Sequence, residues 1–271
     1  MSVLEKNKIA DLSSYNEGMK KSLLDKVFFL GHIDAEIFVD FGCANGELIK
    51  FLNMLFPNYI YIGYDISLEM LSCAHDNLAD ENGQIPKNIF LSCDWDEIIN
   101  QIIPKFDKSA KKCVILSSII HEVYSYSNLL ENDLFWNRIF NSKFDYIAVR
   151  DMIPKRTIDR KSDINDIKNI RKYANKAHLL DFETVWGSIE QNKNLVHFLC
   201  KYRYVNNWKR EVKENYFPLY AESFLEHITD DYVIEYYDEF TLPYLYRNVE
   251  KDFDISIKDT THLKCILRKR T

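Results

Sequence analysis

Short apolar runs alternate with segments of helical periodicity through the first part of the chain. Five runs rich in β-branched and aromatic residues read as buried strands, and each gap between them has room for one helix. The runs span residues 36–41, 59–65, 88–93, 112–117 and 146–149. Apolar strands separated by helices are typical of a parallel sheet with helices on both faces. The pattern therefore predicts an open α/β sheet.

The pattern changes after Pro154. Residues 155–230 are helical in character, basic and rich in aromatics, and they predict an insertion that covers one edge of the sheet as a lid. Two more strand-like runs follow, at 232–237 and 262–267. We therefore expect a core of 36–154 and 231–271, a substrate-binding insertion of 155–230, and a helical lead-in over 1–35.

Charge and composition limit the class of protein. The net charge is −6, although Lys and Arg outnumber Asp and Glu between residues 155 and 213. The first residues lack the apolar stretch of a signal peptide, and no run approaches the length that spans a bilayer. The six cysteines form no C-x-x-C pair, which favours buried free thiols. We expect a cytoplasmic protein, with no metal site suggested by His and Glu spacing.

The strongest local signal follows the first strand. The chain has only seven glycines, and two of them, Gly42 and Gly46, fall in the turn between this strand and the next helix. Glycine allows positive φ and close approach of a ligand to the backbone. Ligands of open parallel sheets bind beside such a turn. The segment Asp40, Phe41, Gly42, Cys43, Ala44, Asn45, Gly46 is therefore a candidate nucleotide-binding turn.

Acidic residues follow the next two strands. Asp65 can accept hydrogen bonds from both hydroxyls of a ribose, and Ile66 would lie against the same ligand. After the third strand, Asp94 can accept from an adenine amino group, and Trp95 can stack on the ring. Each residue alone fits a helix cap or the core equally well. Their order at successive strand ends favours a nucleoside site.

These motifs resemble those of the class I S-adenosylmethionine-dependent methyltransferases over residues 36–154 and 232–270. The family's first motif is an acidic residue, an apolar residue and G-x-G-x-G, and here Ala44 replaces the middle glycine. The resemblance implies a seven-stranded Rossmann-like sheet with an antiparallel last strand. It also implies S-adenosylmethionine as cofactor, with Leu116 and Ser117 lining its methionine end.

The segment after the fourth strand faces the transferred methyl group in this family. His121 lies there and has the chemistry of a general base near pH 7. Asp151 ends the fifth strand and would orient a substrate or terminate the strand. Both are candidate catalytic residues for methyl transfer to an oxygen or nitrogen of a small polar molecule.

Three alternatives stay open at this stage. A NAD-type oxidoreductase would need a third glycine where Glu47 stands. The basic and aromatic insertion suits RNA or a nucleotide-bearing substrate, although a solvated helix face explains it as well. Finally, the chain could be a methyltransferase-like scaffold that binds the cofactor without turnover. The oligomeric state is left undecided by the sequence.

Overall fold

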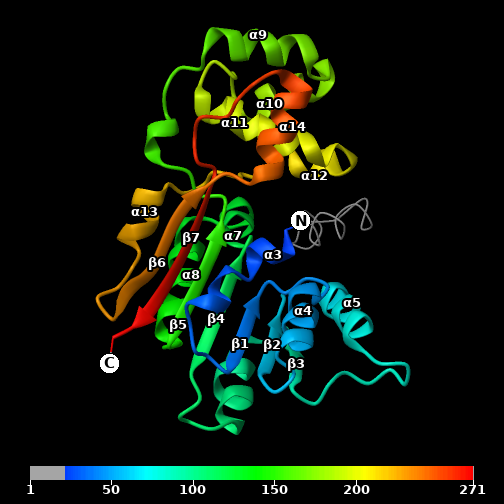
Figure 1. The fold of residues 1–271 in the computed structure, drawn as a ribbon, viewed down its shortest axis with the longest axis vertical. Coiled ribbons are helices and arrows are strands. Elements are labelled where there is room, and N and C mark those ends of the chain that lie inside the picture. Colours follow the sequence, from blue (N-terminus) through cyan, green and yellow to red (C-terminus); the bar gives the residue numbers. More distant parts are fainter. Residues whose placement is uncertain (1–21, 271) are drawn as a thin grey trace.

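The computed structural model describes residues 22–270 and forms a seven-stranded sheet with a helical cap above one edge (Figure 1). The strands follow the order β3-β2-β1-β4-β5-β7-β6. Their bounds are β1 Ile37–Phe41, β2 Ile60–Tyr64, β3 Ile89–Ser92, β4 Lys112–Ser117, β5 Tyr146–Asp151, β6 Tyr232–Phe240 and β7 His262–Lys269. Strands β1 to β5 pair in parallel, whereas β7 pairs antiparallel with both β5 and β6. The predicted fold class is confirmed.

Helices cover both faces of the sheet, as the apolar strands require. One face packs against η1 (Phe28–Gly31), α4 (Glu47–Leu55) and α5 (Leu68–Leu78). The other packs against α8 (Leu129–Asn141), α13 (Ala221–Glu226) and the continuous turn of α6 (Trp95–Glu97) and η2 (Ile98–Ile102). The short elements α3 (Leu23–Lys26), η3 (Ile103–Lys105) and α7 (Ile120–Tyr126) complete this part.

Local sequence signals place several helix starts. The Ser67 hydroxyl accepts a hydrogen bond from the Met70 amide at 3.2 Å and so caps α5, as the sequence predicts. Asn128 and Glu131 form a reciprocal capping box at the start of α8. These caps fix where the chain turns from the carboxyl ends of the strands into the helices.

The helical cap has a hydrophobic core of its own. Its helices are η4 (Arg156–Ile158), α9 (Ile164–Tyr173), α10 (Lys176–Trp186), α11 (Asn192–Lys201), η5 (Tyr202–Asn207), α12 (Trp208–Glu211) and α14 (Pro243–Phe253). The fully buried rings of Phe182, Phe198 and Phe217 lie in this core. Helix α14 also packs here through Leu245 and Val249, so only the strands of 231–271 rejoin the sheet.

The sequence predicts a helical lead-in over residues 1–35 and no membrane-spanning segment. Residues 1–21 of the expected helical lead-in lie outside the described residues, and α3 and η1 account for part of 22–35. Within 22–270, none of the helices combines the length and the apolar character that a bilayer-spanning segment needs.

Candidate active site

A cavity of about 1120 Å³ lies between the carboxyl ends of the strands and the helical cap. The sheet contributes the turns after β1, β2 and β4 to its wall, and the cap contributes residues of α12 and the loop that follows it. Open α/β sheets bind their ligands at this edge. The residues predicted from the sequence can therefore be placed relative to one cavity.

The turn after β1 approaches the cavity through its backbone. Gly42 and Gly46 have φ of 79° and 73°. A Cβ on Gly42 would lie 2.6 Å from the Cδ1 atom of Ile119, so a side chain does not fit there. Gly42 and Ala44 line the cavity. The turn therefore brings its backbone to the cavity wall.

Ala44 stands where the family motif has its middle glycine. Its φ of 46° lies in the left-handed region, which L residues enter at a cost of roughly 1–2 kcal/mol. Its amide donates to Oδ2 of Asp65 at 2.9 Å. The turn after β1 is thereby joined to the end of β2.

Asp65 lies at the cavity wall with both carboxylate oxygens engaged. Oδ1 accepts from the Ser67 amide at 2.9 Å, opposite the bond from Ala44 to Oδ2. Burial raises the pKa of Asp65, whereas these two amides lower it. Each carboxylate oxygen has two lone-pair sites, so both can still accept from a hydroxyl.

The other residues of the turn lie beneath it. Asp40 is buried, and burial raises its pKa to about 7 while the nearby Lys26 lowers it. Cys43 is buried beside Gly63, where its sulfur takes the space that a side chain at 63 would need. Asp40 and Cys43 support the turn from the protein interior and do not line the cavity. Lys26 does line it.

The remaining predicted cofactor residues divide into two groups. Ile66 and Ser117 line the cavity. Asp94 caps α6 by accepting from the amides of Asp96 and Glu97. Trp95 packs in the core and donates to Ser142 Oγ, and Leu116 is fully buried in the same core. The structure places Asp94, Trp95 and Leu116 outside the cavity wall.

His121 and Asp151 form a buried pair at the cavity. His121 Nδ1 lies 2.6 Å from Asp151 Oδ1, and only His121 lines the cavity. Asp151 also accepts from the amides of Ile120 and Met152. Burial lowers the pKa of His121, but Asp151, together with Glu122 and Glu214, raises it, so the net pKa is raised. Asp151 thus contacts and orients the histidine.

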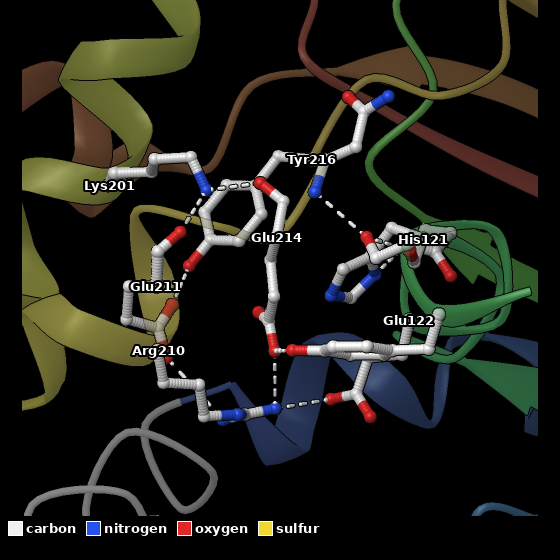
Figure 2. Close-up of polar contacts among 11 residues, drawn as sticks. His121, Glu122, Lys201, Arg210, Glu211, Glu214 and Tyr216 are labelled. Atoms are coloured by element: carbon white, nitrogen blue, oxygen red, sulfur yellow. Dashed lines mark hydrogen bonds and ion pairs between the residues drawn. The ribbon is translucent and has the colours of Figure 1, made fainter. Parts of the chain in front are cut away.

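A set of charged residues, one from α7 and three from the cap, lines the cavity near His121 (Figure 2). We call Glu122, Arg210, Glu211 and Glu214 the cap-side cluster. Arg210 Nη2 lies 3.0 Å from Glu122 Oε1 and 2.6 Å from Glu214 Oε1, and Nη1 lies 3.4 Å from Glu211 Oε1. All four residues line the cavity. One guanidinium therefore joins α7 to the cap.

Sequence reasoning gave this cluster little weight. Glu122 drew attention only as the neighbour of His121, and Arg210 counted among basic residues of a solvated face. In the structure Arg210 is buried and lies 88 residues from its partner Glu122. The run Arg210-Glu211, followed three residues later by Glu214, lies in a segment rich in charged residues, so nothing local set it apart.

Comparisons with known proteins agree on the fold. No protein-family model and no curated protein sequence matches the chain. Among solved structures, the MccD protein superposes with a TM-score of 0.50 at 11% identity, covering 93% of this chain and 98% of its own. The pyocyanin biosynthetic protein PhzM gives 0.51 at 12%, covering 94% of this chain and 57% of its own.

A third similar structure is the plantazolicin methyltransferase BamL with a desmethyl-plantazolicin analogue and S-adenosylhomocysteine. Its TM-score is 0.43 at 14% identity, covering 95% of this chain and 85% of its own. Identities this low establish the fold and nothing finer. The superpositions on MccD and PhzM, together with the strand order β3-β2-β1-β4-β5-β7-β6 and the antiparallel β7, show that the chain has the seven-stranded Rossmann-like fold that the resemblance in sequence implies.

Proposed function

We propose that the protein is an S-adenosylmethionine-dependent methyltransferase that acts on an oxygen or nitrogen of a small polar molecule. The observation that carries this proposal is the His121–Asp151 pair, which shares one cavity with the Gly42 turn and Asp65. A general base and a nucleoside-binding edge in one cavity are what a methyltransferase with a protonated acceptor needs.

The residues around the Gly42 turn fit the cofactor. Gly42 presents backbone without a Cβ, and Asp65 can accept from ribose hydroxyls while it keeps its bonds to Ala44 and Ser67. The exposed side chain of Ile66 offers an apolar contact to the adenine ring. When bound, S-adenosylmethionine supplies a methyl group on an electron-poor sulfur. The protein's part is to align the acceptor and exclude water.

His121 is proposed to take the acceptor's proton. With Asp151 ionised, Nδ1 donates to its carboxylate, and this leaves Nε2 as the basic atom. The acceptor's lone pair forms the new bond to the methyl carbon, the electron pair of the broken carbon–sulfur bond stays on sulfur, and the proton goes to Nε2. Asp151 then stabilises the imidazolium that forms.

Two features support a small acceptor over RNA. The cavity is enclosed by the cap and has the volume of a small-molecule site. Several basic residues of the insertion also pair with carboxylates. Arg160 makes two hydrogen bonds to Asp259, at 2.6 and 2.8 Å, and Arg210 is buried in the cap-side cluster. Among the residues that the structure describes, ion pairs thus engage four of the fourteen basic residues counted between 155 and 213, namely Lys155, Arg160, Arg171 and Arg210.

Calorimetry with S-adenosylhomocysteine tests the cofactor. We expect saturable binding that Asp65→Ala weakens, since each lost hydrogen bond to a charged group is worth about 1.5–3 kcal/mol. Binding of NAD in place of S-adenosylhomocysteine would overturn the proposal.

Methyl-labelled cofactor and a small-molecule extract of the source cells test turnover. We expect labelled product with the wild-type protein and much less with His121→Asn. A protein that binds the cofactor but labels nothing would be the scaffold that the sequence left open.

A further inference from the structure

The cap-side cluster contains more negative than positive charge. Three carboxylates, from Glu122, Glu211 and Glu214, share the guanidinium of Arg210. Lys26 also lies near Glu122, but it interacts with Asp40 and Asp151 as well. Adding Lys26, Asp40 and Asp151 to the cluster therefore adds one positive charge and two carboxylates. The excess of carboxylates remains.

A further cation, Lys201, lies behind the cavity wall. The amino group of Lys201 donates to the backbone oxygens of Glu211 and Glu214 and lies 3.7 Å from the centre of the Tyr216 ring. Lys201 does not line the cavity, whereas Tyr216 does. Burial lowers the pKa of Lys201 to about 7, so its positive charge is weakened at neutral pH.

Two carboxylate oxygens of the cluster are left for a ligand. Glu122 bonds Arg210 through Oε1, and Glu214 bonds both Arg210 and the Tyr126 hydroxyl through its own Oε1. Among the side chains and amides that the structure describes, none donates to Oε2 of Glu122 or of Glu214. Glu214 is only 2% exposed, yet it lines the cavity.

An excess of buried carboxylate is unfavourable until a cation or a proton offsets it. Burial, with Glu122 and Glu211 nearby, raises the pKa of Glu214 to about 7. Aromatic rings of Tyr126, Tyr204, Tyr216 and Tyr244 line the same cavity. Carboxylate oxygens beside aromatic faces are the surroundings that a charged nitrogen group prefers.

We propose that the methyl acceptor carries a positively charged nitrogen group, an ammonium or a guanidinium, which binds between Glu122 and Glu214. This inference rests on the proposed methyltransferase function and narrows its substrate. His121 directly precedes Glu122, and its ring centre lies 5.6 Å from that of Tyr216. The charged group therefore anchors the acceptor within a few bonds of the atom that His121 deprotonates.

Charge fractionation of the acceptor tests the inference. A small-molecule extract of the source cells is separated at pH 7 on cation and anion exchangers, and each fraction is incubated with the protein and methyl-labelled cofactor. We expect the label in the fraction that the cation exchanger retains. Label confined to the anion-retained or unretained fraction would overturn the inference and leave the methyltransferase proposal standing. Absence of label in every fraction would overturn both.

Two variants test the named carboxylates. Glu122→Gln keeps an oxygen for Arg210 and removes one charge, and Glu214→Gln does the same on the cap. We expect each to raise the KM for the active fraction roughly tenfold or more. The affinity for S-adenosylhomocysteine should not change. The matched control is Glu226→Gln. Glu226 is an exposed residue of α13 that does not line the cavity, so this variant should behave as wild type.

The same variants separate the acceptor from the cofactor's own positive sulfur. If the carboxylates serve the acceptor, both variants should bind S-adenosylmethionine and S-adenosylhomocysteine with the wild-type ratio of affinities. A selective loss of S-adenosylmethionine affinity, or an unchanged KM in both variants, would overturn the inference.

Discussion

His121 owes its proposed role chiefly to Asp151. Burial opposes its protonation, but the carboxylate of Asp151 at 2.6 Å, together with Glu122 and Glu214, more than offsets that effect, so its pKa lies above the usual value of 6.5. A general base must be neutral to accept a proton. We therefore expect kcat/KM to rise with pH, with a midpoint above 6.5, as the His121 imidazolium loses its proton.

Asp151→Asn tests that coupling. The asparagine oxygen can still accept from the Ile120 amide, but the negative charge that most raises the pKa of His121 is lost, and only Glu122 and Glu214 then oppose the effect of burial. The midpoint of the pH profile should fall by roughly 1 unit or more, together with a lower plateau. An unshifted midpoint would show that another group titrates.

The same pKa shift has a consequence for folding. A histidine whose pKa is raised in the folded state stabilises the protein fully below its unfolded pKa, and that stabilisation is lost as pH rises through the folded pKa. Urea unfolding of wild type and Asp151→Asn should therefore differ most near pH 6 and less near pH 8. A difference that grows with pH would contradict the assignment.

Ala44 shows a departure from the family motif that the backbone does not favour. Its φ of 46° suits glycine, and its amide holds Asp65. Ala44→Gly should relieve roughly 1 kcal/mol of strain, partly offset by the greater freedom of glycine in the unfolded chain. We expect a melting temperature equal to or above wild type and full S-adenosylhomocysteine affinity. Ala44→Val adds a branched side chain at positive φ, and we expect it to lower both the melting temperature and the affinity for S-adenosylhomocysteine.

At the scale of elements, the sequence predicted the strands well and the cap poorly. Each predicted strand begins within one residue of the observed one, because a buried strand is an unbroken apolar run. Cap helices such as α12 have only four residues and are placed by contacts with distant segments. The bond between Glu122 and Arg210 joins residues 88 apart, and no local pattern encodes it.

Arg210 joins α7 to α12, and we expect the free energy of unfolding to depend on it. Arg210→Met would leave the buried Glu211 and Glu214 and the partly exposed Glu122 without their guanidinium, and breaking a buried pair typically costs about 3–5 kcal/mol. The pKa of Glu214 is already raised by burial to about 7 and would rise further without Arg210, so the deficit should be largest at pH 8 and shrink as pH falls towards 5. Urea midpoints at both pH values measure this. Arg171→Met, which removes an exposed partner of Glu190 at 3.8 Å, is the control and should change stability little.

At the scale of the whole molecule, the paired charges of the cap decide between the two classes of acceptor. Lys155 pairs with Glu239, Arg160 with Asp259 and Arg171 with Glu190. The net charge of the chain is −6, and the cavity wall is rich in carboxylates. The net negative charge and the carboxylates of the cavity wall both disfavour a polyanionic acceptor.

Binding to bulk RNA should therefore be weak and depend little on salt. Proteins that neutralise 6–10 phosphates lose about 10³–10⁵ in affinity between 50 and 200 mM salt, because bound counterions are released. We expect less than a tenfold change here, measured by filter binding at both salt concentrations. Lys209 and Lys213 are exposed residues of the cap, and the double change Lys209→Ala with Lys213→Ala should leave this binding unaltered. A steep loss with salt that also required these two lysines would favour a nucleic-acid acceptor, because only direct phosphate contacts couple affinity to both.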